Sequence, residues 1–177
     1  DFGMNDHSYQ AFREDIFRAY VRSQSEIVKV LKANGARVAL LTPQPIEDKR
    51  ADPDQDVRNQ SLRRFSDGLK AVATKGGVTY GDQFAPYMAI LLRERAGNPK
   101  TFIGGGDAVH PGPIGQMIMA WAILKELGAS ALVSKAEINT ATKTVVAAEA
   151  CKVQNLKVTD GVVSFERLDD ALPMPIE

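Results

Sequence analysis

The chain has 177 residues, of which 44% are hydrophobic and 25% are charged, and these fractions are typical of a globular domain of ordinary size. Its 22 Lys and Arg balance its 22 Asp and Glu, so no overall field favours nucleic acid or anionic lipid as a partner. No apolar run approaches the roughly 20 residues of a membrane span. The single cysteine, Cys151, excludes an intrachain disulfide and a zinc cluster of thiolates, and we expect it to pack inside a strand.

Apolar residues at helical spacing predict a first long helix over residues 8–34, with Ser8 as its N-cap. The continuous apolar run 37–42 predicts a buried parallel strand that ends at Pro43. A charged loop over 47–56 follows.

A second helix is predicted after the charged loop and ends at Gly76-Gly77. A short strand over 78–80 and a third helix over 83–95 follow. The predicted buried residues of these two helices are Val57, Leu62, Phe65, Leu69, Val72, Phe84, Tyr87, Met88 and Leu91.

A long loop over 96–112, rich in Gly and Pro, precedes a fourth helix that begins at Pro113, where the missing N–H of proline costs nothing. The alternation of helices and strands predicts a layered α/β core with a parallel sheet over residues 1–128. The predicted buried face of the fourth helix consists of Ile114, Met117, Ile118, Trp121 and Leu124.

The pattern changes after residue 130. The runs 131–138, 144–158 and 162–165 favour strands, and Asp160-Gly161 is typical of a hairpin turn. Residues 129–177 are therefore predicted to form a small antiparallel β appendage.

His110 is one of only two histidines, and it lies on the long loop just before the fourth helix. Asp107, three residues earlier, can reach Nδ1 of the imidazole in a turn, which would leave Nε2 free to accept a proton from a hydroxyl. A surface loop with a helix-capping Asp and an idle His has the same sequence pattern, so both interpretations stay open.

A second cluster, Gly3–Asp6, lies directly before the first helix. A side-chain amide such as that of Asn5 can donate a hydrogen bond to a developing oxyanion at the top of a parallel sheet. An ordinary strand-to-helix turn is the alternative, because Asn and Asp are common turn residues.

Together, Gly3-Met4-Asn5-Asp6 and Asp107-Ala108-Val109-His110 resemble block III (Gly-x-Asn-Asp) and block V (Asp-x-x-His) of the SGNH hydrolases, the GDSL esterase/lipase superfamily. The segments 41–45 and 110–115 are similar to the family's strand-four loop and to its last loop and helix. The resemblance covers about residues 1–128. It implies a three-layer αβα, flavodoxin-like fold without its first strands at the N-terminus.

The resemblance implies a carboxylic-ester hydrolase in which Asp107 orients His110, His110 acts as general base and then acid, and Asn5 donates to the oxyanion. It implies no cofactor and no metal. The family's Gly-Asp-Ser block does not occur here, and Ser66-Asp67-Gly68 has the wrong order inside a predicted helix. We therefore expect a longer protein, whose N-terminal segment supplies the nucleophilic serine.

Family analogy makes a small molecule or a carbohydrate ester, with acetyl esters as the candidate, the expected substrate. It also favours a secreted or periplasmic location, although one free cysteine leaves the compartment open. The sequence also leaves open whether the protein forms a homo-oligomer.

Two other functions compete with the esterase. One is a catalytically inactive, truncated domain with a binding or assembly role, for which the β appendage would be the contact surface. The other is a metal-dependent hydrolase in which His7 and His110, with Asp6 and Asp107, hold zinc. For His7 itself, a solvated position near the mouth of the site and a substrate contact are the further interpretations.

Overall fold

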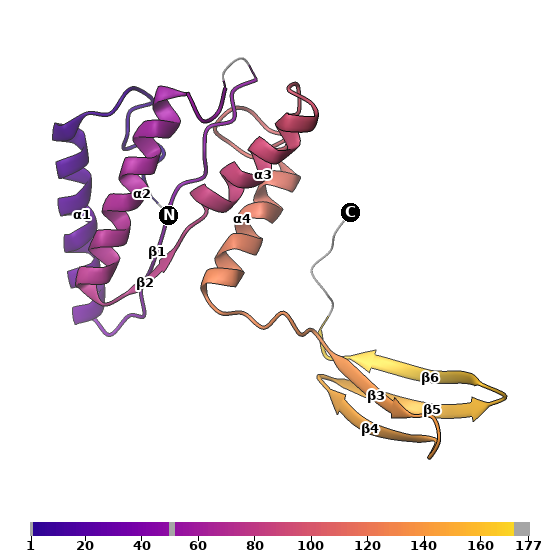
Figure 1. Cartoon of the computed structure of the whole chain (residues 1–177). Coiled ribbons are helices and arrows are strands. Elements are labelled where there is room, and N and C mark those ends of the chain that lie inside the picture. Colours follow the sequence, from indigo (N-terminus) through magenta and orange to yellow (C-terminus); the bar gives the residue numbers. More distant parts are fainter. Residues whose placement is uncertain (1, 50–51, 172–177) are drawn as a thin grey trace. The chain divides into compact units, whose positions relative to one another are not determined.

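The computed structural model describes residues 2–49 and 52–171, and the chain separates into two compact units, Asp1–Ala129 and Ser130–Glu177. Each unit is described by itself (Figure 1). In the described part of the chain, no helix is both long enough and apolar enough to cross a membrane.

The first unit has three layers. A pair of short parallel strands lies between one pair of helices, α1 and α2, and a second pair, α3 and α4 (Figure 1). This arrangement confirms the predicted α/β class. The elements are α1 (Glu14–Ala33), β1 (Ala39–Leu41), α2 (Val57–Gly76), β2 (Thr79–Gly81), α3 (Phe84–Gly97) and α4 (Pro113–Glu126).

Capping groups explain where these helices begin and end. The Asp56 carboxylate accepts a hydrogen bond from the Arg58 N–H at 2.9 Å at the start of α2, and Gly77 ends that helix in the left-handed region with φ 59°. The Thr42 hydroxyl oxygen, at the end of β1, accepts the backbone N–H groups of Gln83 and Phe84 at 2.9 and 3.0 Å. The first turn of α3 is therefore capped by the neighbouring strand.

The core of the first unit consists of apolar side chains from α1, α2, α3 and α4 that close over the strand pair. The predicted buried residues of α2 and α3 are confirmed except for Val57, which is exposed. The buried set includes Tyr20, Val28, Leu40, Ile46, Leu62, Phe65, Leu69, Val72, Phe84, Tyr87, Met88, Leu91 and Ile118.

The segment that follows β1 runs through the interior of the unit. Residues 42–47 are all buried, and the side chain of Asn59 holds the segment by hydrogen bonds to both backbone groups of Ile46. Glu47, the first residue of the charged loop predicted over 47–56, is only 2% exposed. The buried segment carries the chain from the sheet towards the loop that contains His110.

Two predictions about the helices are wrong. Helix α1 begins at Glu14, after Arg13 as N-cap, because Ser8 and Tyr9 have positive φ angles of 59° and 53° and turn the chain away from a helix. In α4, three residues of the predicted buried face, Ile114, Trp121 and Leu124, are 56%, 42% and 47% exposed. A helix on a sheet of two short strands can bury only a narrow stripe, here Gly115, Ile118 and Ala122.

The second unit consists of two antiparallel hairpins, β3 (Lys135–Asn139) with β4 (Thr144–Glu149) and β5 (Cys151–Thr159) with β6 (Val162–Asp169). The run 144–158, predicted as one strand, is two, because Ala150 has a φ of 49°.

The turns and the contact between the hairpins agree with the sequence. Positive φ at Asp160 and Gly161 suits the hairpin turn predicted there. The buried Cys151 places its Sγ 3.2 Å from the Lys135 carbonyl oxygen and so joins the two hairpins. The expected small antiparallel β region is confirmed.

Candidate active site

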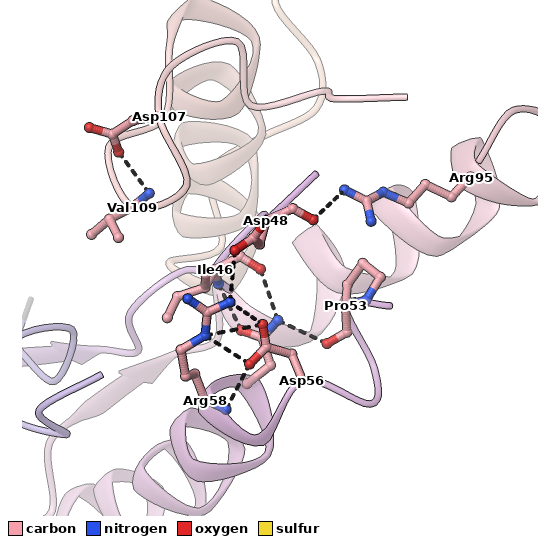
Figure 2. Close-up of polar contacts among 9 residues, drawn as sticks. Ile46, Asp48, Pro53, Asp56, Arg58, Arg95, Asp107 and Val109 are labelled. Atoms are coloured by element: carbon pink, nitrogen blue, oxygen red, sulfur yellow. Dashed lines mark hydrogen bonds and ion pairs between the residues drawn. The ribbon is translucent and has the colours of Figure 1, made fainter. Parts of the chain in front are cut away.

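Asp107 and His110 form a short turn whose geometry explains their spacing. One carboxylate oxygen, Oδ1, accepts the backbone N–H groups of Val109 and His110 at 2.8 and 2.6 Å. The other, Oδ2, lies 2.8 Å from Nδ1 of the His110 ring. The turn therefore presents the carboxylate to one ring nitrogen and leaves Nε2 free. Figure 2 shows Asp107 and Val109 on this loop.

The pair lies at the surface, with side-chain exposures of 83% for His110 and 65% for Asp107. The hydrogen bond from the His110 ring, together with the N–H groups of His110 and Val109, lowers the pKa of Asp107 to about 2. The carboxylate therefore stays ionised near neutral pH and can stabilise a protonated imidazole. A contact between two side chains this exposed adds little to folding stability.

Backbone contacts hold the loop that carries this pair. The Gly112 N–H donates to the Gly104 carbonyl at 2.5 Å and closes the loop at its base. The buried segment after β1 contacts it twice, because the Gln44 side chain donates to the Val109 carbonyl at 2.7 Å and the Glu47 N–H donates to the Ala108 carbonyl at 2.9 Å.

Asn5 lies exposed in a tight turn between residues 3 and 8. The Gly3 N–H donates to Asp6 at 2.8 Å, and the Ser8 N–H donates to the Asn5 carbonyl at 3.1 Å. The Tyr9 hydroxyl donates to Oδ1 of Asn5, which orients the side chain and leaves its NH2 group available as a donor.

The same buried segment contacts both clusters. A Cβ added to Gly3 would lie 3.1 Å from the Pro43 ring, so the turn packs against Pro43 while the next residue, Gln44, bonds to Val109. Met4 and Ala108, one from each cluster, also pack against a common group of buried residues around Ile46. Two clusters that are about 100 residues apart in sequence thus flank one short stretch of chain.

His7 does not lie where the sequence suggested. It is 2% exposed, so the solvated position is wrong, and its ring packs near Phe65 and Tyr9. Burial lowers the pKa of the imidazole, and Nδ1 bonds to the Met4 carbonyl. Across residues 2–49 and 52–171, no three His, Cys, Asp or Glu side chains gather in a way that could hold a metal ion, so the proposed zinc set is not brought together.

None of the serine hydroxyls in the described ranges makes a hydrogen bond to the His110 ring. Ser66 lies inside α2, 5% exposed, and its hydroxyl donates to the Leu62 carbonyl at 2.9 Å. A buried hydroxyl inside a helix cannot reach the His110 ring, so this position agrees with the exclusion of Ser66 as the nucleophile.

A charged cluster adjoins the buried segment on the side of α2 (Figure 2). The Arg58 guanidinium bonds to Asp56 at 2.5 Å and to Asp48 at 3.2 Å, and Arg95 donates to the Asp48 carbonyl at 3.2 Å. Burial by itself would raise the pKa of Asp56, but the hydrogen bonds from Arg58 outweigh it and the pKa lies below its ordinary value. This cluster fixes the chain after Glu47.

Sequence reasoning did not single out Glu47, which contacts the loop that carries the candidate pair. Its carboxylate accepts the backbone N–H groups of Ile103 and Gly104 at 2.7 and 2.6 Å, at the start of the loop that carries His110. No sequence signal separates this residue from the charged run around it.

Comparison with known proteins gives structural neighbours only. No protein-family model matches the chain, and no curated protein matches it in sequence. A gut microbial diltiazem-metabolizing enzyme is 28% identical with a TM-score of 0.73, over 99% of this chain and 43% of that one. Axe2, an acetylxylan esterase from Geobacillus stearothermophilus, is 25% identical with a TM-score of 0.57, over 73% of this chain and 57% of that one. The chain thus spans about half the length of these structures.

Proposed function

We propose that the chain is part of a serine esterase of the SGNH/GDSL type that hydrolyses carboxylic esters. The observation that carries this proposal is the contact between Asp107 and Nδ1 of His110, which leaves Nε2 exposed on a well-held loop. The likeness in fold to an acetylxylan esterase supports the same chemistry. We infer acetyl esters, carried by a carbohydrate or a small molecule, as the substrate class.

The proposed reaction gives each residue one role. As a serine Oγ attacks the ester carbonyl carbon, its proton passes to Nε2 of His110, and Asp107 stabilises the resulting imidazolium. The NH2 group of Asn5 donates to the oxyanion of the tetrahedral intermediate. The imidazolium then returns the proton to the leaving alcohol. Water repeats the sequence on the acyl-enzyme and releases the acid.

The nucleophilic serine is proposed to come from outside these 177 residues. Two observations support this: none of the described serines bonds to His110, and the chain covers 43% and 57% of the two neighbouring structures. The high exposure of the His110 ring is consistent with a further segment that brings the hydroxyl to Nε2.

The competing functions are supported less well. The contact of Asp107 with Nδ1 of the exposed His110 ring favours general-base chemistry over a role in binding alone. A zinc site that uses both histidines conflicts with the burial of His7 and its bond to the Met4 carbonyl.

Steady-state hydrolysis of p-nitrophenyl acetate by the intact protein tests the proposal. His110→Ala should lower kcat by at least about 1000-fold, because the base and the acid of the reaction are lost together. Asp54→Asn is the control, since it alters an exposed carboxylate on the loop before α2 that pairs with Arg63 of that helix. Its kcat should equal that of the wild type. Undiminished turnover in His110→Ala would refute the proposal, and acetate release from acetylated xylan would test the substrate class.

A further inference from the structure

Glu47 contacts the His110 loop from inside the protein. Its Oε1 accepts the Ile103 N–H at 2.7 Å, and its Oε2 accepts the Gly104 N–H at 2.6 Å. Its own backbone N–H donates to the Ala108 carbonyl at 2.9 Å. One residue therefore holds the loop on both sides of Asp107.

The surroundings of the carboxylate fix it in this position. Oε2 lies 3.4 Å from the Tyr87 hydroxyl, and Oε1 lies 4.0 Å from the guanidinium of the largely buried Arg95. Burial and the neighbouring Glu47 carboxylate raise the pKa of Tyr87, so the hydroxyl keeps its proton and remains a donor. The carboxylate thus has donors on both oxygens and one cationic partner.

The packing at this point leaves no room for adjustment. A Cβ at Gly104 would lie 2.7 Å from Oε2 of Glu47 and 2.9 Å from the Tyr87 hydroxyl oxygen. A Cβ at Gly115 would lie 2.8 Å from the same hydroxyl and 3.2 Å from the Gly104 Cα. Glycine at both positions lets the loop and α4 close onto the carboxylate.

We infer that Glu47 is a positioning residue for the esterase reaction: its buried carboxylate sets the path of the loop and thereby the placement of Asp107 and His110. The inference rests on the proposed function. Glu47 lies too deep to contact a substrate, and it acts only through the backbone that it binds. A displacement of the base by about 1 Å is enough to cost on the order of 100-fold in rate.

The test replaces Glu47 by Gln in the intact protein. Glutamine keeps the shape but turns one of the two oxygens into an NH2 group, which must then face a backbone N–H of Ile103 or Gly104. We expect kcat to fall by about 100-fold while KM stays within about threefold, because binding is retained and geometry is lost. The matched control, Glu94→Gln, alters an exposed carboxylate on α3 that pairs with Arg93, and its kcat should not change.

A second readout does not depend on ester hydrolysis. The pKa of Asp107 is low because of its contacts with His110 and Val109, so its carbon NMR signal reports whether the turn is intact. At about pH 3.5 an ordinary Asp is largely protonated, whereas Asp107 in the wild type should remain ionised. In Glu47→Gln its pKa should rise towards the ordinary value, and in Glu94→Gln it should not.

The outcomes separate the two proposals. Wild-type kcat and an unchanged Asp107 titration in Glu47→Gln would overturn the positioning role even if His110→Ala is inactive. Retained activity in His110→Ala would refute the esterase instead, and the titration would still decide whether Glu47 holds the turn. Should Glu47→Gln fail to fold by circular dichroism, Glu47→Asp replaces it, because it keeps the charge beside Arg95 but is one methylene too short to reach both N–H groups.

Discussion

Replacement of Asn59 by Ala should destabilise the first unit strongly. Asn59 is 1% exposed, and its side chain accepts the Ile46 N–H at 2.7 Å and donates to the carbonyls of Ile46 and Pro53, both at 2.8 Å. These bonds join α2 to the buried segment and to the loop that precedes the helix; Figure 2 shows Ile46 and Pro53 in this region. The substitution leaves three buried backbone groups without their partner.

Each buried group that loses its hydrogen bond costs about 1 to 3 kcal/mol. Water that enters the space left by the side chain can satisfy some of these groups, so the lower end of that range applies to each. We therefore expect the free energy of unfolding to fall by about 3 kcal/mol.

Urea unfolding at neutral pH, followed by circular dichroism at the helical minimum, measures this loss, because the described helices all belong to the first unit. Gln60→Ala, an exposed neighbour on α2, is the control and should change stability by no more than about 0.5 kcal/mol. A loss below about 1 kcal/mol in Asn59→Ala would show that the three bonds do not tie the segment to the helix.

Two further changes test the cap and the proposed site. Asp56→Ala should lower the free energy of unfolding by about 1 kcal/mol at neutral pH, because α2 loses its N-cap. The pKa of Asp56 is lowered in the fold, so the contribution of its carboxylate to stability is present above the ordinary pKa and is lost as the pH falls through the lowered value. Urea unfolding should therefore show a smaller loss of stability in Asp56→Ala at about pH 3 than at neutral pH. Equal losses at the two pH values would contradict the argument. Asp107→Asn should lower kcat by up to about 10⁴-fold and leave the melting temperature unchanged. A kcat within about tenfold of the wild-type value would show that Asp107 has no role in the reaction.

The sequence predicted the elements that depend on local chemistry. The apolar spacing of α3 identified all four of its buried side chains, Pro113 marked the first residue of α4, and Asp160-Gly161 marked the last hairpin. The spacing of Asp107 and His110 also predicted the contact between their side chains, because a turn of four residues is a local structure.

Sequence reasoning gave a wrong prediction, or none, where distant parts of the chain decide the outcome. His7 is polar and comes two residues after the exposed Asn5, which suggests a solvated position, but Phe65 of α2 packs near its ring and the side chain is buried. Glu47 belongs to a charged run, but Ile103 and Gly104, more than 50 residues away, provide the donors that make its burial favourable. Trp121 lies on the expected face of α4, but the two-stranded sheet is too narrow to cover it. No local pattern carries this information.

The central claim is that Nε2 of His110 activates a serine that these 177 residues do not include. Labelling of the intact protein with a fluorophosphonate, followed by mass spectrometry of its peptides, tests this most directly. The account predicts one adduct, on a serine outside these residues, and a rate of labelling that falls by at least about 1000-fold in His110→Ala. An adduct on a serine within them, or labelling as fast in His110→Ala as in the wild type, would contradict it.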